Sequence, residues 1–302
     1  MNEVIIRALS YVLMIFIAYF LKCRHVFQES DGRMLAKLTL DVTLPAAIIS
    51  SFRTFRMDYG LLVLILFGLF GNLLQMMSGY LISIGKDKKE RACLINGMSG
   101  YNIGNFTLPF ISGFVGPTGI IATCLYDAGN SIMCNGVDYS IGKQIISNER
   151  SFSFKTLITT LIHIPTFFVY IIMLTSACIG FRMPDQLFTV ASYIGQANGP
   201  IAMFMVGMLL RLDFNKDYLR SASLMIGLRI LISAAFTIIL HYMAFLPAEA
   251  VKAATMVAWS PIASVSPAFV AMLDGNSEKA SFVNTISLLL SIIIIPVLSI
   301  CL

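Results

Sequence analysis

Charged and histidine side chains are scarce in this chain of 302 residues. Only 12% of the residues are charged and three are histidine, whereas hydrophobic residues make up 57%. Soluble domains carry about 25% charged residues, so the composition excludes an ordinary soluble protein. At ~20 residues for each membrane-spanning helix, the length accommodates about ten spans and leaves little for a soluble domain.

Motifs of metal, nucleotide and disulfide chemistry are also missing. The six cysteines form no CxxC pair and have no histidine at ligand spacing, so neither a metal site nor a disulfide framework is predicted. No GxGxxG or GxxxxGK[ST] sequence is present, which argues against a nucleotide-driven pump. The net charge of +5 comes from basic residues scattered over short connections, so we expect no nucleic-acid partner. No catalytic residue, metal or cofactor is predicted.

Long apolar runs predict an all-α integral membrane protein. The first run shows no cleavage pattern, and its positive charges follow it, so we expect a retained helix. Alternate loops hold 14 Lys and Arg residues on one side and five on the other, which predicts that both termini lie outside. We expect ten spans, at 4–21, 34–52, 60–84, 92–115, 118–141, 156–180, 186–210, 218–245, 248–273 and 279–302.

A polar connection near the middle of the chain divides these spans five and five. Two halves with an odd number of spans are inverted in the membrane if they are repeats. Pro45 precedes Pro200 by 155 residues, and Pro109 precedes Pro267 by 158, in equivalent spans. The predicted organisation is a first repeat, a polar connection and a second repeat, at 1–141, 142–155 and 156–302.

The fourth span contains an unusually polar stretch from Asn102 to Pro109, which reads NIGNFTLP. Pro109 removes a backbone donor and Gly104 lowers helix propensity, so a break in the helix is predicted. Freed backbone groups at membrane depth must contact protein or water, which favours a cavity here. Asn102, Asn105 and Thr107 are candidate ligands for an anion at the exposed half-helix N-terminus. Alternatively, these side chains only satisfy backbone groups or join neighbouring helices.

The same residues resemble a known family. Asn102-x-Gly104 followed by Leu108-Pro109 is similar to the Asn-x-Gly-x-x-x-Leu-Pro segment of the auxin efflux carrier family, which includes bacterial malate permease-like proteins. Other matching stretches are Leu44-Pro45, Leu125-Tyr126-Asp127 with Asn130, and Pro261 with Pro267, so the resemblance covers the whole chain.

The resemblance implies a ten-helix inverted repeat in which the fourth and ninth helices break and cross at mid-membrane, as in the related bile acid-sodium symporters. It implies a secondary carrier of small organic anions in a bacterial plasma membrane, working by alternating access, and a homodimer. The crossing would lie near Asn102–Pro109 and Ser260–Pro267. Asn105 and Thr107 depart from the residues common in the family, so we expect a more polar pocket and a different substrate. Candidate ligands from the ninth span are Ser260, Ser264 and Ser266, with helix breaks at Pro261 and Pro267.

Two charges lie deep in predicted spans, where ionisation is costly. Asp127 could carry a coupling proton or bind sodium, or it could form a structural contact with Asn130 or Asn72. Arg229 could attract an anionic substrate or neutralise Asp127. We therefore expect Asp127, Asn130 and Arg229 to take part in coupling.

Two other functions compete with the proton-coupled carrier. A sodium-coupled symporter would need a cluster of oxygen ligands at the crossing. An intramembrane aspartyl protease would need a second aspartate facing Asp127 at the same depth, yet Asp138 lies eleven residues further along the same helix. That spacing is ~16 Å along the helix axis, so a catalytic pair is not expected.

Overall fold

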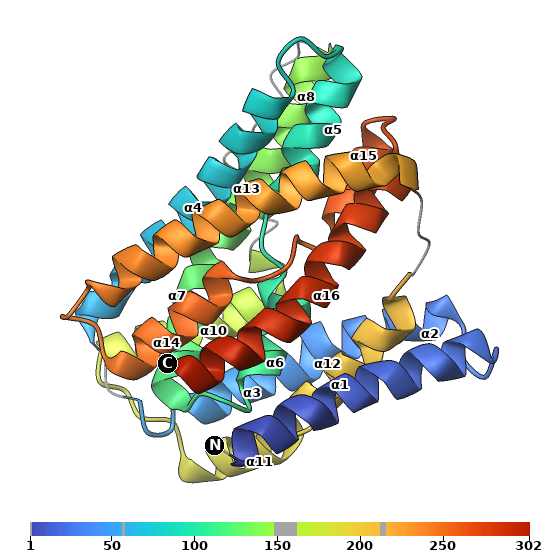
Figure 1. The fold of residues 1–302 in the computed structure, drawn as a ribbon. Coiled ribbons are helices and arrows are strands. Elements are labelled where there is room, and N and C mark those ends of the chain that lie inside the picture. The colour runs from blue at the N-terminus through green and yellow to red at the C-terminus, as the bar shows by residue number, and fades with distance from the viewer. Residues whose placement is uncertain (1, 56–57, 148–161, 212–215) are drawn as a thin grey trace.

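The computed structural model describes residues 2–55, 58–147, 162–211 and 216–302, and these residues are helical apart from their connections (Figure 1). They form no strand; Tyr101 and Ile262 make an isolated antiparallel bridge. The helices of the first half are α1 (Asn2–Cys23), α2 (Glu29–Leu38), η1 (Thr39–Thr43), α3 (Leu44–Ser51), η2 (Tyr59–Leu62), α4 (Val63–Ile82), α5 (Lys88–Met98), η3 (Ile103–Thr107), α6 (Leu108–Ile111), α7 (Pro117–Ile132), η4 (Met133–Asp138) and α8 (Tyr139–Ser147).

The second half, as far as it is described, is built from longer helices with fewer interruptions. These are α10 (Pro165–Cys178), α11 (Asp185–Gly195), α12 (Asn198–Leu209), α13 (Lys216–His241), α14 (Ala248–Ala258), α15 (Ser266–Met272) and α16 (Ser277–Cys301).

Local sequence explains many of the helix starts. The side chain of Asp87 accepts a hydrogen bond from the backbone N–H of Glu90 at the start of α5, and Asn276 accepts one from Lys279 at the start of α16. Proline occupies one of the first two positions of five helices, where its missing N–H needs no helical partner. These prolines are Pro45, Pro109, Pro117, Pro165 and Pro267.

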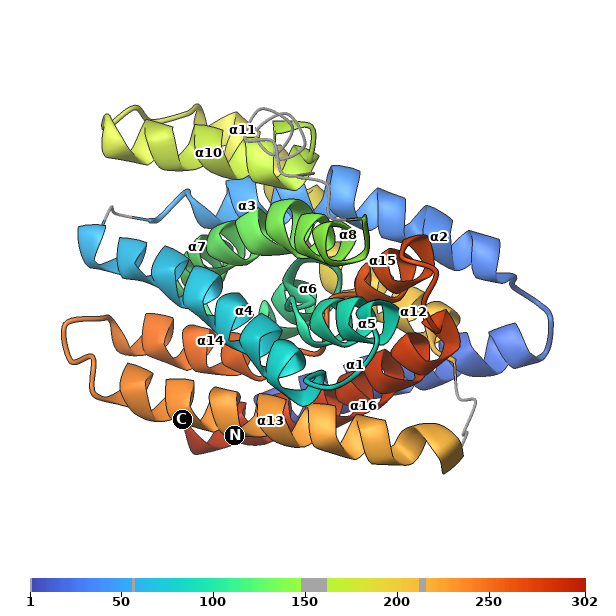
Figure 2. The same cartoon turned by 90° about the horizontal axis from the view of Figure 1, so that it is seen from above.

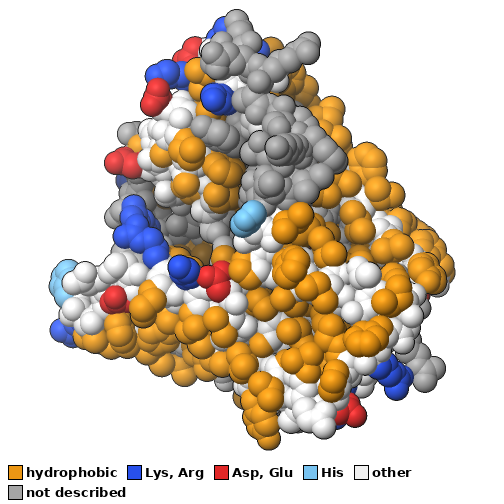
Figure 3. Space-filling view, turned by 180° about the vertical axis from the view of Figure 1, so that it is seen from behind, with side chains coloured by type: hydrophobic (Ala, Val, Ile, Leu, Met, Phe, Trp, Pro, Cys, Tyr) orange, Lys and Arg blue, Asp and Glu red, His pale blue; other side chains and the backbone are white. Residues whose placement is uncertain are grey.

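Within the described residues, five helices are long and apolar enough to cross a membrane. They correspond to the first, second, third, eighth and tenth predicted spans. Side chains along α1 are mostly exposed, and a broad hydrophobic area covers much of the face in Figure 3, with charged groups mainly along its margins. An exposed apolar surface of this extent suits contact with lipid. The five are Ile5–Cys23, Ser30–Ser51, Tyr59–Ile82, Tyr218–His241 and Ser277–Cys301.

The other predicted spans take less regular forms. The fourth, seventh and ninth each consist of two helices separated by a break. The fifth is one helical run through α7, η4 and α8, so residues 142–147 are helical rather than part of the expected connection. Residues 148–155 of that connection, and the expected start of the sixth span, lie outside the described residues.

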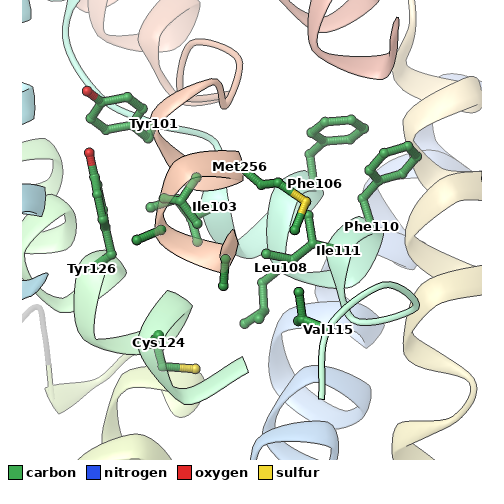
Figure 4. Packing of buried hydrophobic residues seen from close by; sticks show 14 of the residues in the cluster. Tyr101, Ile103, Phe106, Leu108, Phe110, Ile111, Val115, Cys124, Tyr126 and Met256 are labelled. Atoms are coloured by element: carbon green, nitrogen blue, oxygen red, sulfur yellow. The ribbon is translucent and has the colours of Figure 1, made fainter. Parts of the chain in front are cut away.

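The centre of the protein is formed by η3 and α6 packed against α7, α12 and α14 (Figure 2). Figure 4 shows Phe106, Phe110 and Ile111 gathered beside Met256 of α14, and these side chains are almost completely buried. α4 and α7 cross with their backbones in contact, since a Cβ atom at Gly129 would overlap the carbonyl oxygen of Ile65. α7 thus contacts both α4 and the interrupted fourth span.

Candidate functional site

Two interrupted helices meet near the centre of the fold. α5 ends at Met98 and helical structure resumes at Ile103, whereas α14 ends at Ala258 and α15 begins at Ser266. The two connecting segments run antiparallel. The N–H of Asn102 donates to the carbonyl of Pro261 at 2.9 Å, and the N–H of Ala263 donates to the carbonyl of Gly100 at 3.3 Å. Each segment thus satisfies backbone groups that the other leaves free.

Gly100 permits this close approach. Its backbone φ of +81° is one that side chains other than glycine rarely adopt. A Cβ atom there would lie 2.7 Å from the Cβ of Ala263, closer than ordinary packing allows. Glycine at this position therefore serves both the turn and the contact between the two segments.

The predicted helix-breaking residues lie around these segments. Pro261 lies within the second break, while Gly104 is in η3, after the first break. Pro109 and Pro267 stand at the starts of α6 and α15. The first break itself runs over residues 99–102. Gly100 permits the turn in this segment, and hydrogen bonds to the segment between α14 and α15 stabilise it.

Several polar side chains predicted as ligands form hydrogen bonds between the two interrupted helices. Thr107 donates through its hydroxyl to Ser260 at 2.7 Å and lies 3.2 Å from the carbonyl oxygen of Asn102. Ser266 donates to the carbonyl of Asn96 at 2.7 Å. Thr107, Ser260 and Ser266 are all buried, so their hydroxyls hold the crossing together.

Asn105 and Ser264 differ from this group because they line a cavity. The amide nitrogen of Asn105 donates to the Ser264 hydroxyl at 3.0 Å, and its amide oxygen is buried without a partner. The two ends of an amide can be exchanged, so this unpaired end can act as an acceptor or a donor. Asn105 therefore lines the cavity and has one buried amide end that no group in the described residues pairs with.

The cavity has a volume of about 330 Å³ and lies where η3 and the segment before α15 meet α7, α3 and α10. Asn102, Asn105, Asp127, Asn130 and Ser264 all line it. None of the described residues that line it is Lys or Arg. The cavity thus brings together residues from both halves of the chain, with one carboxyl group among neutral polar groups.

Asp127 is held at this cavity by Asn130. The Asn130 amide nitrogen donates to Asp127 Oδ1 at 3.0 Å and to the carbonyl of Tyr101 at 3.1 Å. The Asn130 oxygen accepts from the Tyr101 N–H at 2.9 Å and from the Asn72 amide at 3.3 Å. A single side chain therefore connects Asp127 to the backbone of the first break.

Arg229 lies on the opposite side of the crossing and does not line this cavity. Its guanidinium donates to Gln75, to the carbonyl of Met98 at 2.6 Å and to the carbonyl of Ser260 at 3.2 Å. It also lies over the ring of Tyr101, 5.2 Å from the centroid. These partners, rather than Asp127, surround the charge among the described residues.

The electrostatic arrangement follows from helix direction. Arg229 contacts the carbonyl ends of α5 and α14, where the helix dipole is negative. The cavity contains Ile103 and Gly104, which open η3, and Val265, which precedes α15. At helix starts the backbone N–H groups carry positive partial charge, so the cavity can stabilise an anion without a cationic side chain.

Some residues that line the cavity were not predicted from the sequence. Cys124, Ser131 and Cys134 repeat at helical spacing around Asp127, and a helical projection from that residue would have found them. Thr166 and Tyr170 of α10 also line the cavity, but no sequence signal connected them with Asp127. Among the described residues, no cluster of His, Cys, Asp and Glu could hold a metal ion.

Comparison with known proteins identifies the family of this chain. Residues 4–299 match the family of membrane transport proteins. The chain belongs to this family. The predicted resemblance to auxin efflux carriers is thereby confirmed.

One relative matches this chain over almost its whole length. An uncharacterized transporter from Methanothermobacter thermautotrophicus is 23% identical over 301 residues, which is 97% of each chain. The match to the family and the apolar helices together make this chain an integral membrane protein of a transporter family.

Proposed function

We propose that this protein is a secondary transporter that carries a small organic anion together with a proton. The observation that supports it is the cavity at the crossing, which combines helix starts, the side chain of Asn105 and the carboxyl group of Asp127. Its volume suits a small molecule. Binding at neutral dipoles rather than at a buried Lys or Arg also lets the ligand leave again.

The proton follows from the charges in the cavity. An anionic substrate and an ionised Asp127 would place two negative charges in one space, and no Lys or Arg among the described lining residues compensates them. Like charges at short range disfavour the ionised state of one partner. Asp127 therefore accepts a proton when the anion binds and gives it up when the anion leaves.

The layout that completes this function has ten spans in two inverted groups of five, with both termini outside a bacterial plasma membrane. Five spans are the long apolar helices, and we assign the others to α5–α6, α7–α8, α10, α11–α12 and α14–α15. The antiparallel contact between the two interrupted helices supports the inversion. Epitopes at both termini should be accessible from outside intact cells; protection of either would contradict this orientation.

Uptake by reconstituted vesicles tests the function. We would assay labelled malate, succinate, indole-3-acetate and a bile acid, each with an imposed proton gradient, an imposed sodium gradient or neither. We expect saturable uptake of at least one anion, driven by a proton gradient and abolished by a protonophore. Uptake driven by sodium alone would replace proton coupling with the sodium-coupled alternative, and no uptake of any anion would reject the substrate class.

A further inference from the structure

A second carboxyl group lies beyond the cavity. Asp138 ends η4 and is 1% exposed, and it does not line the 330 Å³ cavity that reaches Asn130 and Cys134 on the same helical run. Both of its carboxyl oxygens are buried without a hydrogen-bond partner. An ionised carboxylate left in this state would be strongly disfavoured.

Two polar side chains lie beside Asp138, and each is already engaged with another group. The side chains of Ser99 and Asn72 lie within range of its carboxyl group. The Ser99 hydroxyl donates to the carbonyl of Asn96 at 3.3 Å, and the Asn72 nitrogen donates to Asn130, while the Asn72 oxygen has no donor. One proton on Asp138 would supply the missing donor to Asn72 or Ser99.

No charged group competes for this position among the described residues. The thiol of Cys134, on the same helical run, faces Asp138. On α5, Arg91 lies over the ring of Tyr80 of α4, and Cys93 lies against Gly275. Lys143 of α8 is exposed. Asp127 of α7 is separated from it by the Asn72–Asn130 pair.

We propose that Asp138 is a second proton-binding group of the transporter, neutral in this conformation and coupled to the broken helix. The coupling has two routes. Ser99 is the first residue after α5, so its position changes if the break moves, and Asn72 connects through Asn130 to the backbone of Tyr101. The carboxyl oxygen binds one proton from water on one side of the membrane and releases it to the other when the break rearranges. This role in transport rests on the proposed function.

Infrared spectroscopy of the purified full-length protein tests the proton directly and without substrate. We expect wild type at neutral pH to show the carbonyl band of a protonated carboxylic acid. Asp138→Asn should lose that band, whereas Asp127→Asn should retain it. Ser99→Ala should shift its frequency because a neighbouring hydroxyl is removed, and this variant serves if Asp138→Asn does not fold. An unchanged band in these Asp138 and Ser99 variants, or loss of the wild-type band on adding sodium at constant pH, would overturn the proposal.

Transport tests the coupling. If one of the coupled protons is lost, accumulation of substrate by Asp138→Asn should fall about tenfold for a gradient of one pH unit, while exchange of labelled for unlabelled substrate continues. Asp87→Asn is the control, because Asp87 is an exposed helix cap and asparagine caps equally well. Wild-type accumulation in Asp138→Asn would overturn the coupling role. A failure of the proposed transport function can be told apart from a failure of this proposal. In that case the wild-type protein itself would show no uptake, while the infrared result would still hold.

Discussion

The two sides of the helix crossing differ in what their polar groups contact. On the side where α5 and α14 end, Arg229 donates to the carbonyls of Met98 and Ser260, and Ser233 donates to Ala258 at 2.5 Å. On the side where η3 and α15 begin, Asn105 has an unpaired end and Asp127 faces a cavity. Arg229 and Ser233 are paired inside the protein and hold the fold, whereas polar groups that line a cavity can bind and release a ligand.

The largest effect on stability should come from the side of the crossing where Arg229 lies. Replacing Arg229 with Met leaves two buried carbonyl ends and Gln75 without their donor, which we expect to destabilise the protein by about 3 kcal/mol or more. Thermal unfolding in detergent would measure it. Arg220→Met is the control, since Arg220 is exposed on the same helix. Equal unfolding temperatures for the two variants would show that Arg229 does not stabilise the crossing.

The second-largest effect should come from Asp127, which lines the cavity. Asp127→Asn keeps a polar side chain of the same shape but cannot bind and release a proton. We expect proton-driven accumulation to fall by roughly tenfold or more at a gradient of one pH unit, with substrate exchange preserved. Accumulation should also depend less steeply on the proton gradient. Wild-type accumulation in this variant would remove Asp127 from coupling and weaken the contrast between the two sides.

The close contact between the two backbone segments at Gly100 and Ala263 can be tested with glycine variants. Gly100→Ala combines a positive φ with an overlap at Ala263, whereas Gly180→Ala has a φ of +71° and open space around it. The backbone cost alone should be about 1 kcal/mol at either position. We expect Gly100→Ala to be the less stable by a further ~1–3 kcal/mol, because the segments must move apart. Equal stabilities would mean that the contact tolerates a methyl group.

The smallest effect should separate ligand binding from structure within one segment. Asn105→Ala removes a polar side chain that lines the cavity and whose contact with a ligand is worth ~1 kcal/mol, so KM should rise about fivefold with little change in unfolding temperature. Thr107→Val removes a hydroxyl that bonds Ser260 inside the protein and should lower the unfolding temperature without raising KM. The reverse result would exchange the roles of these two residues.

The site was predicted from sequence where the signal was local. The polar NIGNFTLP segment indicated an irregular helix, and Asp127 with Asn130 stood out because both are polar in an apolar run. The anticipated contact of Asp127 with Asn130 is present at 3.0 Å. A role for Arg229 beside Asp127 did not follow, since depth in a span does not tell which face of a helix a side chain occupies. Asn72, the other anticipated contact of Asp127, bonds Asn130 instead, and the role of Gln75 was not assigned for the same reason.

Membrane insertion and helix starts depend on short stretches of chain, through apolar length, loop charge, capping side chains and proline. Composition and apolar pattern alone therefore determined that this is a helical membrane protein, and the resemblance of short motifs to a known family indicated the transporter family. Only the tertiary structure paired Asn105 with Ser264 and Thr107 with Ser260, residues more than 150 positions apart. It also decided which polar groups are satisfied and which face a cavity. The physical reason is that a buried polar group is stabilised by whatever partner packing brings to it, and packing depends on the whole chain.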